Sequence, residues 1–303
     1  EEFAACPFHY FASRTLRLKP TETYEIEPRH RGTLQHELLR LFHSEVQEAG
    51  LHWRDLNPSK AQALIFRLSE GLIEHVERKL FATDASSRIS AVMLTENVAD
   101  LVSQAILWFD QYTLDPVLSE LAFGTAESEL TGWEIPLEGE RTLTLRGIID
   151  RIDVTELANG SLGVVVVDYK SSARSLDKRK LQSGLQLQLP AYLAFLVRHN
   201  HWLQSHPRLK QLTSVEPIGA FYLGLNPKRQ KHSSSKKSTN KDKSFQFSGI
   251  FNNDSLRSLD CREGDQRGDQ IKYAINKDGS FSKRGHEGVS AQALETFLET
   301  VTS

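Results

Sequence analysis

The sequence has little of what marks a disulfide-bonded or membrane-embedded protein. Its 303 residues include only two cysteines, Cys6 and Cys261, which is too few for a disulfide scaffold or for a four-cysteine zinc or iron–sulfur site within the chain. We therefore expect two reduced thiols and a cytoplasmic location. No apolar run approaches the roughly 18 residues of a membrane helix, and the N-terminus lacks the basic start and apolar core of a signal peptide.

The chain also lacks an excess of charge of one sign. Lys and Arg number 37 and Asp and Glu 39, which leaves a net charge of −2, so any surface that binds nucleic acid must be local. Apolar residues make up 39% and charged residues 25%, as in soluble globular proteins. Because the sequence starts at Glu1 and its only methionine is Met93, we interpret it as a fragment or a processed form.

The first of four expected regions, residues 1–115, is predicted to be mainly helical. Residues 1–20 are rich in aromatic side chains and indicate a short helix or turn that docks on a core. A longer helix should open near Gly32, because apolar residues recur there at helical spacing. Two more helices are expected at Ser59–Leu80 and Glu96–Tyr112.

The second region, residues 116–225, is dominated by strand patterns. Asn159-Gly160 marks a turn between two of the strands, and a helix centred on Pro190–Val197 follows the fourth strand. The expected strands are Val117–Phe123, Ser128–Leu137, Arg141–Val154, Gly163–Tyr169 and Ile218–Leu225. We predict an α/β fold in which a central mixed sheet is flanked by helices.

The third region, residues 226–244, is polar and basic, and the fourth, residues 245–303, returns to strand and helix patterns with a terminal helix at Ala291–Val301. The stretch Lys228–Lys243 holds seven Lys and Arg residues without apolar anchors. We interpret it as a solvated loop or linker, as most charge runs are. The alternative is contact with a DNA backbone through Lys228, Arg229, Lys231, Lys236 and Lys237.

The strongest chemical signal is a carboxylate on one predicted strand and a carboxylate with a lysine at the end of the next. Asp150 lies in a run rich in β-branched residues, and Asp168 and Lys170 follow the apolar run Val164–Val167. Side chains at i and i+2 of a strand face the same side, so Asp168 and Lys170 should share a site while Tyr169 points away. Two carboxylates can hold a hard divalent cation, and a lysine can orient a water. The pattern indicates metal-assisted phosphodiester hydrolysis; ordinary strand ends at the surface are the alternative.

Four other residues are candidates for this site, although each is a weak candidate when taken alone. Gly147 removes a side chain near Asp150 and is expected to admit a ligand backbone. Gln188 and Tyr192 are neighbours on one helix face and point either to the site or to solvent. His36 lies about 200° around its helix from the apolar stripe, so it is either a surface histidine or a metal ligand.

Five segments, taken in order along the chain, carry a family resemblance. They are Cys6-Pro7-Phe8-x-Tyr10-Phe11, Gly32-Thr33-x-x-His36-Glu37, Gly147-x-x-Asp150-Arg151-x-Asp153, Asp168-Tyr169-Lys170-Ser171 and Gln188-x-x-x-Tyr192. The chain resembles the RecB-like branch of the PD-(D/E)XK nucleases, and within it the C-terminal nuclease region of the AddB component of AddAB-type helicase–nucleases. Each segment alone is weak, and the order of all five makes the resemblance specific.

The resemblance implies a restriction-endonuclease-like core with a metal-dependent site. The implied ligands of Mg²⁺ or Mn²⁺ are His36, Asp150, Asp168 and the main-chain carbonyl of Tyr169. Lys170 would position the attacking water and offset charge in the transition state. Gln188 and Tyr192 would support the site and the DNA strand, and Glu120 resembles a family acid ahead of the core strands.

The resemblance also implies an iron–sulfur cluster held by four cysteines, one before the core and three after it. Cys6 matches the first by its context, and the other three are absent up to Ser303. We interpret Cys6 as the remnant of such a site, with truncation favoured over loss of the cluster.

The predicted function is metal-dependent hydrolysis of DNA, with exonuclease action during double-strand-end processing and recombinational repair and a helicase as the partner subunit. Two alternatives stay open: a non-cutting DNA-binding or scaffold subunit, and a stand-alone RecB-like nuclease of CRISPR adaptation. The presence of Asp150, Asp168 and Lys170 argues against the first. The chain length and the helical N-terminal part argue against the second.

Overall fold

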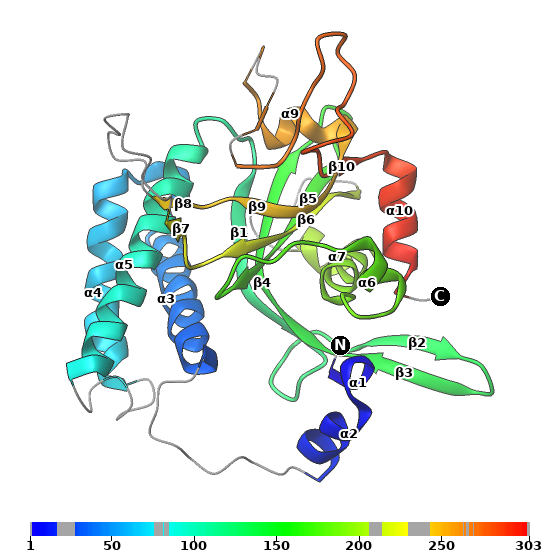
Figure 1. Cartoon of the computed structure of the whole chain (residues 1–303), viewed down its shortest axis with the longest axis horizontal. Helices are drawn as coiled ribbons and strands as arrows, with labels where there is room; N and C mark the ends of the chain where they lie inside the picture. Colours follow the sequence, from blue (N-terminus) through cyan, green and yellow to red (C-terminus); the bar gives the residue numbers. More distant parts are fainter. Residues whose placement is uncertain are drawn as a thin grey trace.

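The computed structural model describes residues 2–16, 28–75, 81, 85–205, 214–229, 243–262, 264, 267–268 and 270–301. Within them, a mixed sheet with strand order β1-β4-β5-β6-β9-β10 carries helices on both faces (Figure 1). Its strands are β1 (Asp115–Phe123), β4 (Gly147–Glu156), β5 (Leu162–Lys170), β6 (Val215–Gly224), β9 (Phe247–Asn252) and β10 (Gly288–Val289). Because β5 is antiparallel to β4 and parallel to β6, the predicted α/β fold with a mixed sheet is confirmed.

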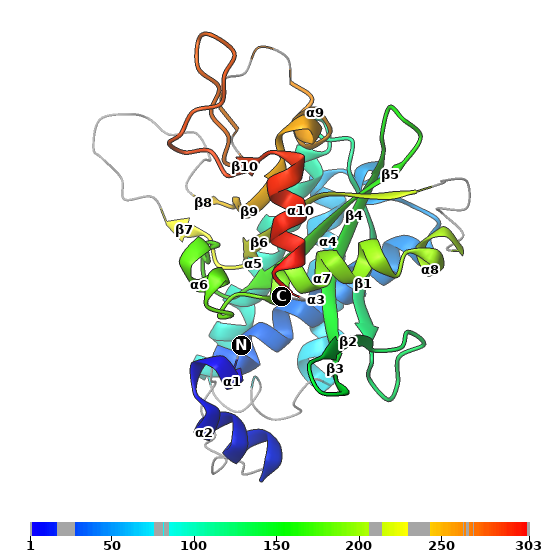
Figure 2. The ribbon, with the colours of Figure 1, turned by 90° about the vertical axis from the view of Figure 1, so that its right-hand side faces the viewer.

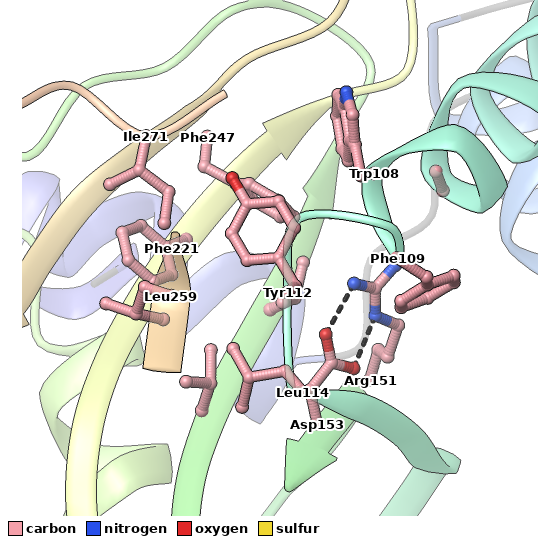
Figure 3. A pocket seen from close by; sticks show the side chains of 13 residues that line it. Trp108, Phe109, Tyr112, Leu114, Arg151, Asp153, Phe221, Phe247, Leu259 and Ile271 are labelled. Carbon is pink, nitrogen blue, oxygen red and sulfur yellow. Dashed lines mark hydrogen bonds and ion pairs between the residues drawn. The ribbon is translucent and has the colours of Figure 1, made fainter. Parts of the chain in front are cut away.

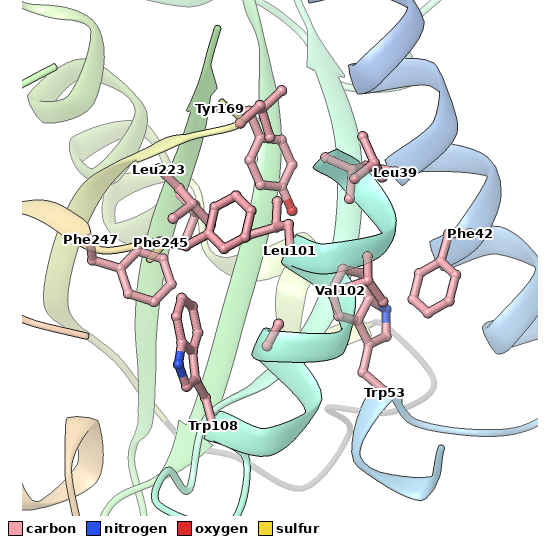
Figure 4. Close-up of a cluster of buried hydrophobic side chains, with 14 of the residues drawn as sticks. Leu39, Phe42, Trp53, Leu101, Val102, Trp108, Tyr169, Leu223, Phe245 and Phe247 are labelled. Carbon is pink, nitrogen blue, oxygen red and sulfur yellow. The ribbon is translucent and has the colours of Figure 1, made fainter. Parts of the chain in front are cut away.

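Three long helices lie on one side of the sheet, packed against one another. They are α3 (Pro28–Glu48), α4 (Pro58–His75) and α5 (Ala85–Trp108). The alternation of β5 turns Val165, Val167 and Tyr169 toward this face, where they join one continuous apolar cluster. Figure 4 shows Tyr169 and Leu223 from the sheet beside side chains of α3 and α5. Burying one such side chain stabilises the fold by about 1.5–3 kcal/mol.

The opposite face is covered by α7 (Gln188–Arg198) and α10 (Ala291–Glu299), as Figure 2 shows. Val164 and Val166, the alternate residues of β5, pack here in a second apolar cluster. The side chain of Ser290 caps α10 by accepting a hydrogen bond from the N–H of Ala293. Shorter helices complete the connections: α6 (Lys178–Gln182), α8 (His201–Ser205), α9 (Leu256–Leu259), η2 (Trp53–Asp55) and η3 (Asn253–Ser255).

The predicted long helices are confirmed, with different bounds. The helix expected to open near Gly32 begins at Pro28, where proline suits a first turn. The helix expected at Glu96–Tyr112 is α5, which begins eleven residues earlier, at Ala85. Residues 76–80 of the helix expected at Ser59–Leu80 lie outside the described residues.

One predicted strand was wrong. Arg141–Val154 is two strands: β3 (Arg141–Leu145) pairs with β2 (Trp133–Leu137) in a separate two-stranded sheet, and β4 begins at Gly147 in the central sheet. The run favours extended structure throughout, so its pattern contains no boundary where the chain passes between sheets. The strand expected from Ser128 starts only at Trp133, because Ser128 closes a turn with Thr125. The turn at Asn159-Gly160 is confirmed, with Gly160 at φ +77°.

The N-terminal segment is helical as predicted, in α1 (Glu2–Ala5), α2 (Pro7–Tyr10) and η1 (Phe11–Thr15). The expected docking on a core was wrong for the described part, because Phe3 is 60% and Phe8 77% exposed. Phe3 packs edge-on against Tyr10 within the segment, with 5.5 Å between ring centroids. Among the described residues, no helix has the length and apolar character needed to cross a bilayer. The division into four regions stays a prediction.

Candidate active site

The site forms where β4 and β5 separate. Their antiparallel ladder runs from Glu156 paired with Leu162 to Arg151 paired with Val167. Beyond this point a side chain replaces the backbone partner: Asp150 Oδ2 accepts a hydrogen bond of 2.6 Å from the N–H of Tyr169. This bond fixes a buried carboxylate at the end of the ladder.

Asp168 and Lys170 lie next to each other, as the strand alternation predicts. Lys170 Nζ lies 2.5 Å from Asp168 Oδ2 and donates to Gln188 Oε1 at 3.0 Å. Gln188 Nε2 in turn donates to Asp168 Oδ1 at 2.7 Å and lies 3.3 Å from the hydroxyl of Tyr192. Gln188 and Tyr192 of α7 therefore face the site and not solvent, and α7 holds the lysine and its carboxylate in place.

His36 approaches from α3 on the other side. Its Nδ1 lies 3.4 Å from Glu120 Oε1 and 3.6 Å from Asp150 Oδ1. The imidazole also meets the ring of Tyr169 edge-on, with 5.7 Å between ring centroids. Tyr169 points away from Lys170 as predicted, and its ring packs against the imidazole of His36.

Glu120 reaches this group through an unusual backbone. It lies in β1 between Ser119, paired with Arg151, and Leu121, paired with Ile149. Its φ of +52° falls in the left-handed region, which costs a non-glycine residue of order 1 kcal/mol or more. Such strain is retained where the surroundings enforce it, often at functional sites, and here it accompanies a carboxylate beside His36.

The electrostatics show an excess of negative charge. Burial raises the pKa of Asp150 to about 7, and the charges of Asp168 and Glu120 add to the rise while His36 opposes it. Burial also raises the pKa of Asp168, against the effect of Lys170. Burial disfavours the charged form of His36, but its bond to Glu120 and the nearby carboxylates outweigh this and raise its pKa. A bound cation would stabilise these groups.

The residues present fit a divalent metal ion. One ligand atom from each of His36, Glu120 and Asp150 lies within 4.8 Å of the other two, and no other such group occurs among the described residues. Carboxylate oxygens with one imidazole suit Mn²⁺, and carboxylates suit Mg²⁺. Two of the expected ligands, His36 and Asp150, therefore come together with Glu120. Asp168, a third expected ligand, bonds Lys170 and Gln188. The ligand roles of Asp168 and of the Tyr169 carbonyl stay predictions.

Comparison with known proteins identifies the family. The family model described as the PD-(D/E)XK nuclease superfamily matches residues 1–272. The chain belongs to the PD-(D/E)XK nuclease superfamily. It is similar to proteins named as the B component of an ATP-dependent helicase/deoxyribonuclease. Identity to the Natranaerobius thermophilus protein is 34% over 233 residues, covering 75% of this chain and 19% of the relative. Identity to the Bacillus subtilis protein is 28% over 301 residues, covering 93% and 24%.

These relatives confirm the resemblance that the five motifs predicted. They are also much longer: the chain spans about a fifth to a quarter of their length. The similarity therefore covers only part of each relative, and it does not by itself give this chain the activity, substrates or partners of a whole relative.

A buried ion pair beneath the site was missed as a functional candidate. Arg151 Nε and Nη2 bond the carboxylate of Asp153 at 2.7 and 2.6 Å, as Figure 3 shows. The guanidinium also lies 3.4 Å from the hydroxyl of Tyr169 and 5.3 Å from the centre of the Trp53 ring. Burial opposes the charged form of Arg151, but the charge of Asp153 outweighs it and raises the pKa of the guanidinium. Opposite charges at i and i+2 of a strand were the signal for this pair.

The pocket in Figure 3 is a gap in the apolar core, lined by aromatic and aliphatic side chains around this ion pair. It leaves space of about 20 Å³ for water-sized molecules, which corresponds to about one water. We assign it to packing and not to ligand binding.

Gly147 has a different role from the one predicted. A Cβ atom there would lie 2.8 Å from Cε1 of Tyr192 and 3.1 Å from its hydroxyl oxygen. The space therefore holds the Tyr192 ring and not a ligand backbone. The glycine lets α7 approach β4 closely enough for the Tyr192 ring to lie against the strand.

The remaining candidate residues lie away from the site or outside the described residues. Cys6, between α1 and α2, and Cys261, after α9, are exposed, and a cluster role for Cys6 stays a prediction. Lys228 and Arg229 form β7 (Lys228–Arg229), which pairs with β8 (Lys243–Ser244) at the base of the basic stretch. Lys231, Lys236 and Lys237 lie outside the described residues.

Proposed function

We propose that this chain is a divalent-metal-dependent deoxyribonuclease that degrades DNA from its ends. The observation that carries the proposal is the grouping of His36, Glu120 and Asp150 beside the Lys170–Asp168 ion pair. His36 and Glu120 also line an open cavity of about 480 Å³, so the site is accessible from solvent. Family membership supports the same chemistry.

The side chains divide the work of phosphodiester hydrolysis. His36, Glu120 and Asp150 would hold Mg²⁺ or Mn²⁺, which polarises a phosphate and lowers the pKa of a water when bound. Lys170, fixed by Asp168 and Gln188, is placed to orient the attacking water and to offset charge on the phosphate. Gln188 accepts a hydrogen bond from Lys170 and contacts Tyr192, so these two residues would help to position the lysine.

The names of the relatives support a cellular setting. Both are named as the B component of an ATP-dependent helicase/deoxyribonuclease. We propose that this chain acts with a helicase subunit in processing double-strand breaks, so that unwinding delivers strand ends to the site.

The test is cleavage of end-labelled DNA by Lys170→Ala, with Lys180→Ala as the matched control on the exposed surface of α6. We expect Lys170→Ala to lose at least about a hundredfold in rate, Lys180→Ala to resemble the unmodified chain, and chelator to stop cleavage. Full activity of Lys170→Ala would overturn the proposal. DNA binding without cleavage by the unmodified chain would favour the non-cutting scaffold subunit.

A further inference from the structure

A second cavity lies beside the candidate site, on the side of Lys170 away from His36. It has a volume of about 200 Å³ and is formed by the loop after β5, the end of β6 and the start of β9. Its polar lining residues are Arg174, Ser175, Asn226, Gln246, Ser248 and Lys272. None of these six residues belongs to the five motifs that carry the family resemblance.

The register of the sheet connects this cavity to the site. Asp168 on β5 pairs with Tyr222 on β6, and Tyr222 pairs with Ser248 on β9. Paired residues of neighbouring strands point to the same face, so the three side chains form one row across the sheet. Two strand spacings put Ser248 about 10 Å from Asp168. The row therefore starts at the candidate site and ends in the cavity wall.

Positive charge follows the same row. The guanidinium of Arg174 lies 5.2 Å and the ammonium of Lys170 lies 5.7 Å from the centre of the same Tyr222 ring. Lys272 Nζ donates to Ser248 Oγ at 3.0 Å and to Glu287 Oε1 at 2.9 Å. An ammonium has three donors, so Lys272 is held at the wall with a third N–H beyond these two bonds.

The cavity on the His36 side has the opposite character. Its charged lining residues besides His36 are Glu37 and Glu120, and Glu37 is paired with Arg40. A nucleic acid strand carries one negative charge per nucleotide, and contacts with Lys and Arg supply most of its affinity. A strand whose scissile phosphate lies at the site therefore finds more positive charge on the Arg174 side than on the Glu37 side.

We propose that this cavity, which we name the Arg174 pocket, binds a backbone phosphodiester of the DNA strand next to the bond that is cut. The planar guanidinium of Arg174 suits two parallel bonds to phosphate oxygens, and Lys272 and Ser175 supply further donors. The inference rests on the proposed nuclease function and adds the strand-binding position to it.

The experiment measures binding of labelled single-stranded DNA, in chelator so that no cleavage occurs, over a series of salt concentrations. Arg174→Ala should weaken binding about tenfold and lower the slope of log affinity against log salt by about 0.7, the value for one lost phosphate contact. Arg179→Ala on α6, an exposed arginine, is the matched control and should change neither. An unchanged slope for Arg174→Ala overturns the pocket, even where the unmodified chain cuts DNA.

A second pair of variants tests the proposal independently of whether Arg174→Ala folds correctly. Ser175 lies on the exposed loop, so Ser175→Glu adds a negative charge at the pocket without disturbing the core, and Ser175→Ala is its neutral control. Ser175→Glu should raise KM for DNA cleavage severalfold, and Ser175→Ala should not. Equal KM values for the two overturn the proposal. A free mononucleotide that raises the melting temperature through Arg174, without any Arg174 effect on DNA binding, would assign the pocket to nucleotides instead.

Discussion

Two groups of buried charges lie next to each other on β4, one residue apart in the sequence. Arg151 and Asp153 face the helices α3 to α5 and neutralise each other through two short hydrogen bonds. Asp150 lies where the ladder of β4 and β5 ends, and with Glu120 and Asp168 it forms a group in which carboxylates outnumber the positive charges of His36 and Lys170. The same strand therefore contributes to an ion pair whose charges balance and to a group with excess negative charge.

The difference distinguishes buried charged residues that stabilise the fold from neighbouring ones that serve metal binding and cleavage. A buried charge is costly unless it is paired or binds a metal. The ion pair meets this condition within the chain, and the raised pKa of Arg151 reflects it. Asp150 meets it only in part, through His36 and the N–H of Tyr169, and burial raises its pKa to about 7. We expect substitutions in the pair to act on stability, and substitutions in the carboxylate group to act on pH dependence, metal binding and cleavage.

The largest effect should come from breaking the ion pair on one side. Asp153→Ala leaves the guanidinium of Arg151 buried without its partner, and we expect a loss of about 3–5 kcal/mol in the free energy of unfolding. Urea unfolding in chelator measures it. Adding Mn²⁺ should leave the difference from the unmodified chain unchanged, because Asp153 is not among the residues grouped at the metal site.

The control removes both charges together. Arg151→Met combined with Asp153→Leu replaces the pair by apolar side chains, which proteins often tolerate with little change in stability. The double variant should therefore be more stable than Asp153→Ala. A double variant as unstable as Asp153→Ala would mean that the pair does more than neutralise itself.

A second effect, of about 4 kcal/mol at most, should appear in the pH dependence of the metal-free chain. The pKa of Asp150 is raised from its ordinary value of 3.8 to about 7. The folded state thus binds a proton that the unfolded state releases, and the stability it contributes is present below about pH 4 and is lost as the pH rises to about 7. Relative to Asp150→Asn, the unmodified chain should become less stable over this range, measured by urea unfolding at several pH values.

Adding a metal ion to the same unfolding measurement should have the opposite effect on stability. Mn²⁺ should stabilise the unmodified chain at pH values above about 7, where Asp150 is ionised, and should stabilise Asp150→Asn much less. Parallel curves for the two proteins, with and without Mn²⁺, would show that Asp150 is not part of a metal site.

Much of this site could be predicted from the sequence because its residues lie at fixed intervals in regular elements. Alternation along a strand places Asp168 and Lys170 together and turns Tyr169 away, and helical spacing makes Gln188 and Tyr192 neighbours. These relations depend only on local geometry, and the structure shows each of them.

The parts that could not be predicted depend on contacts between distant segments. Glu120 lies beside His36 and Asp150 because its backbone in β1 is left-handed. No residue pattern predicts this backbone conformation. The break between β3 and β4 depends on which sheet each half joins, and both halves favour strands equally. The role of Gly147 requires knowing that the Tyr192 ring, more than forty residues later, occupies its side-chain space.

The smallest effect tests whether the two charge groups are independent. Tyr169 touches both: its hydroxyl lies 3.4 Å from Arg151 Nη1, and its backbone N–H bonds Asp150. Tyr169→Phe removes only the first contact and should cost about 0.5–1 kcal/mol of unfolding free energy. In a double-mutant cycle with Asp150→Asn, the coupling should stay below about 0.5 kcal/mol, because the bond to Asp150 comes from the backbone. A larger coupling would mean that the ion pair and the carboxylate group form one network through the Tyr169 ring, and that the separation drawn between them is wrong.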